Sequence, residues 1–328
     1  METVILDSDD VTESTQIGEV IDAVEGAFGA YAHGDTQMPA KSYIDLPQYN
    51  GDFRSMPAYI ETDEWEAAAI KWVNVHPDNP DDDGLPTVMG TLIYSDPTTG
   101  FPLAVMDATD LTRLRTGAAA AVATRYLAHE DATSLGLVGA GVQAHSQLDA
   151  ISHVRDIERV VISDLDAEVR AAFVEKYGED FEVEAGDITA AATCDVVSTT
   201  TPVRTPIVEE VGEGTHINAM GADAEGKHEI ADEILQEATL VIDDYEQCTH
   251  SGEINVPWSA GILTDEDIHG EIGDIVTGTL AGRTADDEVT VFDSTGLAIQ
   301  DVAAAHVVYE HAVGEGVGTG FDMVGLSE

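Results

Sequence analysis

The chain has 328 residues, of which 64 are Asp or Glu and 13 are Lys or Arg, and its formal charge is −51. This charge excludes ordinary electrostatic binding to nucleic acid or to anionic lipid. Hydrophobic residues make up 43% of the chain, which argues against a disordered acidic protein. Because the carboxylates are spread along the whole sequence, we expect a folded cytoplasmic protein from a halophile, where multimolar salt reduces the Debye length to roughly 3 Å or less.

The first part of the chain is expected to form a mostly β domain with covering helices. Apolar residues at helical spacing predict an amphipathic helix over 15–33. Several β-like segments follow, and the turn residues Pro97 and Gly100 predict a hairpin from the last two. These segments are 41–46, 52–60, 67–75, 91–96 and 101–107. An Ala-rich helix is predicted next, over 110–128.

From Ser134 onward the pattern changes to strands that alternate with helices. A strand, a glycine turn and a helix occupy 134–154, and a second strand and helix occupy 159–178. Further strand candidates are 181–186, 195–201, 215–221, 239–244 and 289–296. This alternation indicates an α/β fold with a doubly wound parallel sheet. The segment 297–316 is predicted to form a helix that can return to the first domain.

A glycine turn marks the start of the second domain. Gly139, Gly141 and Ala144 form a G-x-G-x-x-A pattern between an apolar strand and a helix. This context is typical of dinucleotide binding, because the glycines allow a tight turn and let the backbone approach a pyrophosphate at the helix N-terminus. Asp164 follows about twenty residues later, where a carboxylate accepts hydrogen bonds from the ribose and repels a 2′-phosphate, so we predict NAD over NADP. A structural glycine turn with an unrelated acid is the alternative.

The few cations in so acidic a chain are expected to have internal roles. Lys41, Arg54 and Lys71 lie among apolar neighbours in β-like segments, and Arg115 precedes a run of small residues. A buried cation needs an anionic partner, so a structural ion pair is one interpretation of each. Four such cations in the domain without the glycine turn favour a second interpretation, a carboxylate-bearing substrate held by Lys and Arg. A small amino or keto acid beside NAD is then the economical prediction.

Other chemistry is not indicated. The acidic loop 79–90 begins like a calcium loop but has Gly90 where the closing Glu is needed, so no metal site is predicted. Cys194 and Cys248 are far apart, which indicates neither a CxxC motif nor a disulfide framework. No leader segment and no apolar run long enough to span a bilayer is expected from the sequence.

Several long and idiosyncratic segments match one known family. They are MPAK, GDFRSMPAYI, KWVNVHPDNP, GLPTVMGTLIYSDPTTGFPLAVMDAT, LRTGAAAAVATRYLA, VGAGVQA, INAMGADAEGKHEI, SGEINV and FDSTGLAIQDVA. On these segments the chain resembles the ornithine cyclodeaminase/mu-crystallin family over essentially its whole length. Within that family it is most similar to the archaeal alanine dehydrogenase branch.

The resemblance implies an architecture and a set of site residues. Family members look like homodimers, with a Rossmann NAD-binding domain, here 129–296, inserted in a mixed α+β substrate-binding/dimerisation domain, here 1–128 plus 297–328. Lys41 and Lys71 are expected to face the substrate, with Lys71 as the proton donor/acceptor. Asp223 matches a catalytic acid/base of the cyclodeaminases. Arg54 and Arg115 complete the expected substrate-binding residues. The positions expected to contact NAD are Thr87, Arg115, Gly139, Gly141, Val142, Gln143, Asp164, Asp166, Ala219, Met220, Gly221, Lys227 and Ser294.

One position separates the branches of the family. Cyclodeaminases look to carry a Glu ahead of a Met-Pro pair, near the distal amine of the substrate, and this chain has Arg54 there. An Arg repels a second ammonium, so the resemblance implies NAD-dependent oxidative deamination of L-alanine to pyruvate and ammonia, and the reverse reductive amination. An ornithine cyclodeaminase with recycled NAD, a ketimine reductase and a ligand-binding mu-crystallin-like protein stay open. Glu225 departs from the family pattern, in which that position is often uncharged.

Overall fold

The computed structural model of the chain describes residues 2–325, which form two compact units. Unit 1 consists of Met1–Arg115 and Leu297–Glu328, and unit 2 consists of Thr116–Gly296. The first boundary falls inside helix α4 (Thr109–Leu127), whereas the sequence places it after that helix, at 128. The difference arises because α4 is continuous, with its first turns packed in unit 1 and the rest in unit 2.

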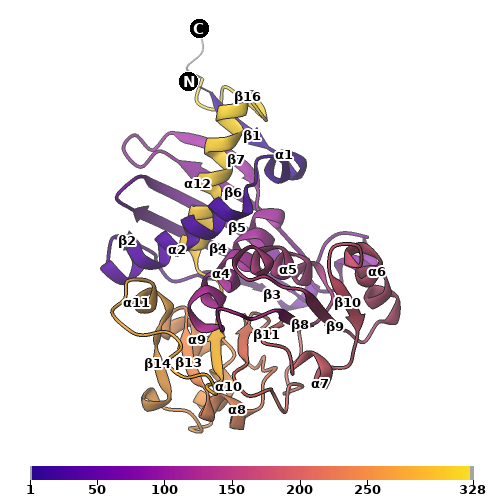
Figure 1. Cartoon of the computed structure of the whole chain (residues 1–328). Helices are drawn as coiled ribbons and strands as arrows, with labels where there is room; N and C mark the ends of the chain where they lie inside the picture. The colour runs from indigo at the N-terminus through magenta and orange to yellow at the C-terminus, as the bar shows by residue number, and fades with distance from the viewer. Residues whose placement is uncertain (1, 326–328) are drawn as a thin grey trace. The chain divides into compact units, whose positions relative to one another are not determined.

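Unit 1 is built on a mixed, eight-stranded sheet within the described residues (Figure 1). The strand order is β16-β1-β7-β6-β5-β4-β2, with β3 also paired to β4. The strands are β1 Thr3–Leu6, β2 Thr36–Gln37, β3 Ser42–Leu46, β4 Gly51–Glu61, β5 Glu66–Val75, β6 Val88–Ser95, β7 Pro102–Asp107 and β16 Thr319–Phe321. The predicted hairpin is the antiparallel pair β6 and β7, and its turn has Gly100 in the left-handed region at φ 71°.

Helices cover one face of this sheet. The helices that contact it are α1 Ser8–Glu13, α2 Ile17–His33 and α12 Ala298–Glu315, and the start of α4 reaches Lys71 through Thr112. The short helix α3 Asn79–Asp82 lies in the loop between β5 and β6, and a 3₁₀ turn lies at Pro47–Tyr49. The apolar stripe of α2 buries Val20, Ile21 and Val24, as its helical spacing predicts. Helix α12 packs against α2 and against β4, β5 and β6, so the closing segment does return to the first domain.

Unit 2 contains the predicted doubly wound sheet, in which every strand pair is parallel. Its order is β10-β9-β8-β11-β12-β15-β13-β14. The strands are β8 Ser134–Val138, β9 Arg159–Ser163, β10 Glu182–Ala185, β11 Val196–Thr199, β12 His216–Ala219, β13 Thr239–Ile242, β14 Ile268–Glu271 and β15 Thr290–Asp293. From β8 the chain first adds β9 and β10 on one side of the sheet, and it then crosses to the other side of β8 to add β11 and β12. In open α/β sheets, ligands bind at the point between β8 and β11 where the order of strands changes sides.

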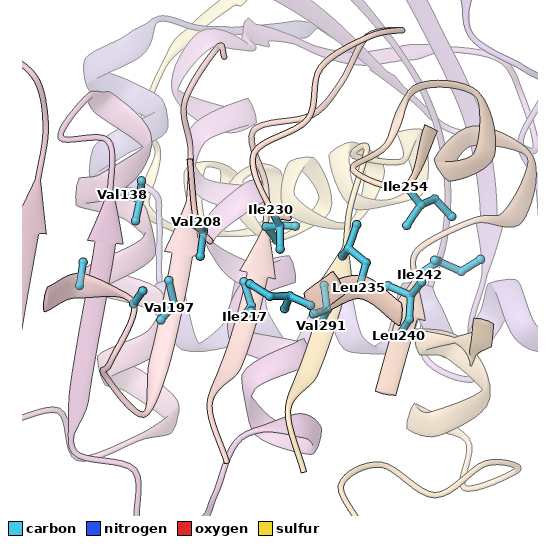
Figure 2. Close-up of a cluster of buried hydrophobic side chains, with 14 of the residues drawn as sticks. Val138, Val197, Val208, Ile217, Ile230, Leu235, Leu240, Ile242, Ile254 and Val291 are labelled. Atoms are coloured by element: carbon cyan, nitrogen blue, oxygen red, sulfur yellow. The ribbon is translucent and has the colours of Figure 1, made fainter. Parts of the chain in front are cut away.

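Helices pack on both faces of the parallel sheet. They are α5 Val142–Val154, α6 Ala167–Tyr177, α7 Ile188–Ala191, α8 Asp232–Glu237, α9 Tyr245–Ser251, α10 Asn255–Ser259 and α11 Ile272–Val276, with a 3₁₀ turn at Asp265–Asp267. Figure 2 shows one core, where Val197, Ile217 and Val291 project from adjacent strands and are fully buried. A second core includes Leu135 and Ile162. Because both faces of the sheet are covered, its strands are apolar and rich in β-branched residues.

Candidate active site

Lys71 lies in the middle of β5 and points to the covered face of the sheet. The register places it opposite Met56 on β4 and Leu92 on β6, which are both buried. The Lys71 side chain is 1% exposed. Its Nζ donates hydrogen bonds to Asp301 Oδ1 at 2.8 Å and to Thr112 Oγ1 at 3.2 Å. The unusual cation in an apolar run is thus held inside unit 1 by groups from α12 and α4.

Arg115 belongs to the same buried cluster. Its Nε donates to Asp301 Oδ1 at 3.2 Å, and its Nη1 donates to Gln300 Oε1 at 3.1 Å. Gln300 and Asp301 lie in the first turns of α12, and Arg115 lies on α4, so two helices bring these groups to Lys71 on the sheet. When Lys71 is protonated, the cluster contains two cations and one carboxylate, and this excess of positive charge suits an anionic ligand.

The pKa of the Lys71 amine is lowered from 10.5 to about 7. Burial is the largest cause, because an apolar surrounding disfavours the charged form. The Asp301 carboxylate opposes this effect, and the positive charges of Arg115 and Lys41 add to it. Lys71 can therefore take up and release a proton near neutral pH, as a general base requires.

Arg54 on β4 and Lys41, just before β3, are the other two cations expected at the site. Arg54 is opposite Val73 in the β4–β5 register, so its side chain leaves the sheet on the same face as Lys71. Its guanidinium pairs with both oxygens of Asp52, at 2.7 and 3.1 Å, and lies over the Tyr43 ring. Lys41 precedes β3, and its positive charge is close enough to lower the pKa of Lys71. Thr87 precedes β6, where its carbonyl accepts a hydrogen bond from the His76 amide.

In unit 2 the glycine turn joins β8 to α5. Gly139 has a φ of 98°, which a residue with a side chain rarely adopts, and Gly141 is the N-cap of α5 without a side-chain hydrogen bond to the helix. A Cβ built on Gly141 would meet nothing within 4 Å, so the backbone there is open to an approaching group. Val142, the first residue of α5, is 70% exposed, while Ala144 is buried against the sheet. An open, uncapped helix N-terminus fits a pyrophosphate.

Asp164 and Asp166 follow β9 at the same edge of the parallel sheet. Asp164 accepts hydrogen bonds from the Ala140 amide at 2.8 Å and from the Asp166 amide at 2.9 Å, which fixes its carboxylate beside the glycine turn. Asp166 caps α6 by accepting from the Glu168 amide. Leu165 between them is 100% exposed. Two acids next to an open glycine turn fit a nucleoside with free ribose hydroxyls and disfavour one with a 2′-phosphate.

The remaining expected contacts lie after β12, in α5 and after β15, all within unit 2. Ala219 ends β12, and the Met220 amide donates to the Thr199 carbonyl. Lys227 Nζ pairs with Asp223 Oδ1 and donates to the Gly221 carbonyl at 3.3 Å. The Gln143 carbonyl and side chain both accept from the Ser146 hydroxyl. Ser294 is buried and donates its hydroxyl to Asp243 Oδ2 at 2.9 Å.

The structure thus divides the expected site residues between the units. Lys41, Arg54, Lys71, Thr87 and Arg115 belong to unit 1, and the others belong to unit 2. Asp301 and Gln300 were missed by the sequence reasoning. The available signal was a Gln-Asp pair inside the apolar segment LAIQDVAAA, since a carboxylate that a helix buries needs a cationic partner.

Within residues 2–325, no group of three or more His, Cys, Asp or Glu side chains is arranged to hold a metal ion. The same residues contain no helix that is both long and apolar enough to cross a membrane.

Comparison with known proteins settles the family. The model of the ornithine cyclodeaminase/mu-crystallin family matches residues 1–316. The chain belongs to this family. Alanine dehydrogenase of Archaeoglobus fulgidus is 50% identical over 323 residues, which cover 97% of this chain and 98% of that protein.

Solved structures of the family agree with the fold. The structure of an archaeal alanine dehydrogenase dimer with bound NAD has a TM-score of 0.94 and 47% identity, and the match covers 98% of this chain and all of that one. The Thermococcus litoralis Δ1-pyrroline-2-carboxylate reductase in complex with NADH and L-proline has a TM-score of 0.92 and 36% identity, over 97% of this chain and 99% of that one. The predicted family membership and fold class are therefore confirmed.

Proposed function

We propose that the chain is an NAD-dependent alanine dehydrogenase. The reaction converts L-alanine, NAD⁺ and water to pyruvate, ammonium, NADH and a proton, and it also runs in reverse as reductive amination. The observation that carries the proposal is the buried Lys71 amine, whose pKa is about 7, among cations that suit a carboxylate. The 50% identity to the A. fulgidus enzyme supports alanine as the substrate.

NAD is the cofactor of this enzyme. The Gly139–Gly141 turn and the N-terminus of α5 hold its pyrophosphate, and Asp164 and Asp166 take its adenosine ribose. Relatives of the chain have been solved with NAD or NADH bound, which supports this assignment. When bound, NAD supplies the acceptor for the α-hydride of the amino acid.

The residues of the chain then have separate roles. Arg54, Lys41 and Arg115 hold the carboxylate of the substrate through charge-assisted hydrogen bonds. The neutral Lys71 amine accepts a proton from the substrate ammonium, which leaves the substrate amine uncharged for hydride loss. After Lys71 releases that proton to solvent, it accepts a second one from the water that adds to iminopyruvate. Asp223 is the second proton carrier, and it releases ammonia from the hydrated carbon. Unit 1 would thus be the substrate-binding part of the molecule and unit 2 the cofactor-binding part.

Arg54 favours the dehydrogenase over an ornithine cyclodeaminase. Its guanidinium projects from β4 on the face that also carries Lys71. A second ammonium on the substrate would be repelled by Arg54, whereas a short amino acid presents only its carboxylate. The Asp52 partner keeps Arg54 in place through two hydrogen bonds, so the site does not offer that carboxylate freely to an amine.

The test uses NAD with either L-alanine or L-ornithine in molar KCl, and it follows NADH absorbance and released ammonia together. Stoichiometric NADH and ammonia from alanine alone would establish the dehydrogenase. Ammonia from ornithine with no net NADH would identify a cyclodeaminase and overturn the role given to Arg54. If neither amino acid yields NADH or ammonia, other amino acids and cyclic imines should be tested as substrates.

We further propose that the enzyme is a cytoplasmic homodimer. The face of the unit 1 sheet opposite Lys71 carries Ile70, Trp72 and Ile93, which are 39%, 43% and 40% exposed. An apolar patch on so acidic a chain favours contact with a second copy, because a twofold axis brings the same patch together twice. A relative solved as a dimer supports this assembly.

Replacing Ile93 with Glu is expected to convert the dimer to a monomer. Ile93 lies directly opposite Ile70 in the β5–β6 register, at the centre of the patch, and a twofold contact would place two buried carboxylates there without partners. Light scattering after size exclusion in molar KCl measures the mass. Leu85→Glu is the matched control, since Leu85 is exposed in a loop and should leave the mass unchanged. An Ile93→Glu protein that stays dimeric would place the interface elsewhere.

A further inference from the structure

Asp301 is a buried carboxylate near the start of α12 that has no role in the reaction as described above. Its Oδ1 atom accepts a hydrogen bond from Lys71 Nζ at 2.8 Å and another from Arg115 Nε at 3.2 Å. The Asp301 and Lys71 side chains are each 1% exposed. One carboxylate oxygen is therefore shared by two cations in surroundings that exclude solvent.

The hydrogen bonds of this cluster are incomplete. Within residues 2–325, Asp301 Oδ2 is buried without a hydrogen-bond partner. The adjacent Gln300 accepts from Arg115 through Oε1, while its Nε2 is also buried without a partner. An ion pair that serves only stability is expected to have all its buried lone pairs and protons satisfied, because each unsatisfied one destabilises the fold. The arrangement is instead typical of a functional site.

Charged and polar groups reach Lys71 from three other parts of unit 1. Asp301 belongs to α12, and Arg115 and Thr112 belong to α4. Lys41 stands immediately before β3. Burial, Arg115 and Lys41 all lower the pKa of Lys71, and Asp301 is the group that raises it. Asp301 therefore keeps the pKa of the amine near neutrality, where burial beside two cations would otherwise hold it lower.

We propose that Asp301 is a positioning residue whose shared Oδ1 fixes the Lys71 amine and the Arg115 guanidinium and sets how readily Lys71 holds a proton. The inference rests on the proposed function, since it gives Asp301 a part in the proton transfers of that reaction. Asp301 acts through Lys71 and not on the substrate. Arg115 draws on the same oxygen, so removing Arg115 and removing Asp301 must change the protonation of Lys71 in opposite directions.

A titration of Lys71 by NMR tests this without requiring turnover. The chain has four lysines, at 41, 71, 176 and 227, so protein labelled with ¹³C-lysine gives few Cε signals, and Lys71→Met identifies the one from Lys71. In the unaltered protein this signal should titrate at about 7. In Asp301→Asn, which keeps the shape and removes the charge, the midpoint should fall by about one unit or more. In Arg115→Gln it should rise.

The matched control is Asp110→Asn, which removes a partly exposed carboxylate paired with Arg113 on α4 and should leave the Lys71 midpoint unchanged. An unchanged midpoint in folded Asp301→Asn overturns the proposal. If Asp301→Asn does not fold, the Arg115→Gln variant provides the test. A Lys71 midpoint that does not rise in that variant also overturns the proposal.

Kinetics separates positioning from mere stability. In active Asp301→Asn, the acidic limb of kcat for alanine oxidation should move to lower pH together with the NMR midpoint, and kcat should fall more than affinity. If Asp301 contributed only to stability, its replacement would change neither the acidic limb of the kcat profile nor the NMR midpoint of Lys71. If the unaltered protein does not oxidise alanine, the proposed function fails, while the titration still decides the role of Asp301.

Discussion

Replacement of Lys71 by alanine is expected to lower kcat for alanine oxidation by about 10²- to 10⁴-fold. The physical reason is that the cluster offers no substitute base. An arginine guanidinium does not act as a base in proteins, and Asp301 Oδ1 already accepts hydrogen bonds from Lys71 and Arg115. Steady-state kinetics in molar KCl, with NADH absorbance as the signal, measures the loss. Added methylamine should restore part of the rate by entering the space of the missing side chain.

The matched control is Lys176→Ala. Lys176 is an exposed lysine on α6 of unit 2, beside Tyr177, and its removal should leave kcat unchanged. A Lys71→Ala enzyme that kept its kcat and lost only affinity would refute the base role. Lys71 would then serve only to bind the substrate carboxylate.

The same residue fixes the sign of the pH dependence. Only the neutral amine acts as a base, so kcat for oxidation should rise as the pH passes upward through about 7, the pKa of Lys71. In reductive amination the protonated amine is the acid, so kcat should fall through the same region. Rate profiles that do not bend between pH 6 and about 8 in either direction would assign the proton transfer to another group.

Much of this molecule follows from local pattern. The 3.6-residue spacing of Val20, Ile21 and Val24 predicts α2, and the alternation of β-branched strands with helices after Ser134 predicts the parallel sheet. The short strands β1, β2 and β16 were missed, because two to four residues carry no usable period. Strand β14 was missed because IHGE is neither apolar nor alternating.

The candidate site was only partly predictable. A lone lysine in an apolar run indicates burial, and the structure agrees for Lys71. Its partner could not be found from spacing, since Asp301 is 230 residues away and joins Lys71 only when α12 packs on the sheet. Local pattern also leaves the environment of Ser294 undefined, because its hydroxyl bonds to Asp243 from a different strand end. The periodicity of apolar residues predicts helices and strands. Contacts between side chains of different helices and strands depend on how these pack, which the periodicity does not show.

The fold is expected to be lost when KCl is lowered from about 3 M to about 0.1 M. Thirteen cations cannot neutralise 64 carboxylates, and the formal charge is −51. At about 0.1 M salt the Debye length is roughly 10 Å, so carboxylates on neighbouring turns and strands repel one another, whereas at about 1 M it is roughly 3 Å. Compaction raises this repulsion, so the unfolded chain is favoured. Far-UV circular dichroism during dialysis measures the loss.

Protonation should partly replace salt in this experiment. Burial raises the pKa of Asp293 from 3.8 to about 7, and it raises the pKa of Glu253 well above 4.5. The folded state therefore holds protons that the unfolded state gives up, and this contribution is fully present below about 3.8 and is lost as the pH rises through about 7. Lowering the pH from 8 to about 5.5 at low salt should thus recover helical signal.

A neutral osmolyte separates the two effects of salt. Sucrose strengthens apolar burial without screening charge, so it should restore less structure at low salt than KCl does. Full recovery in sucrose would mean that the fold lacks apolar stabilisation and is not limited by repulsion. Full circular dichroism in dilute buffer at pH 8 would contradict the halophilic interpretation altogether. The exposed carboxylates would then need another explanation, since the cores around Ile217 and Leu135 would be sufficient to hold a chain of this charge together.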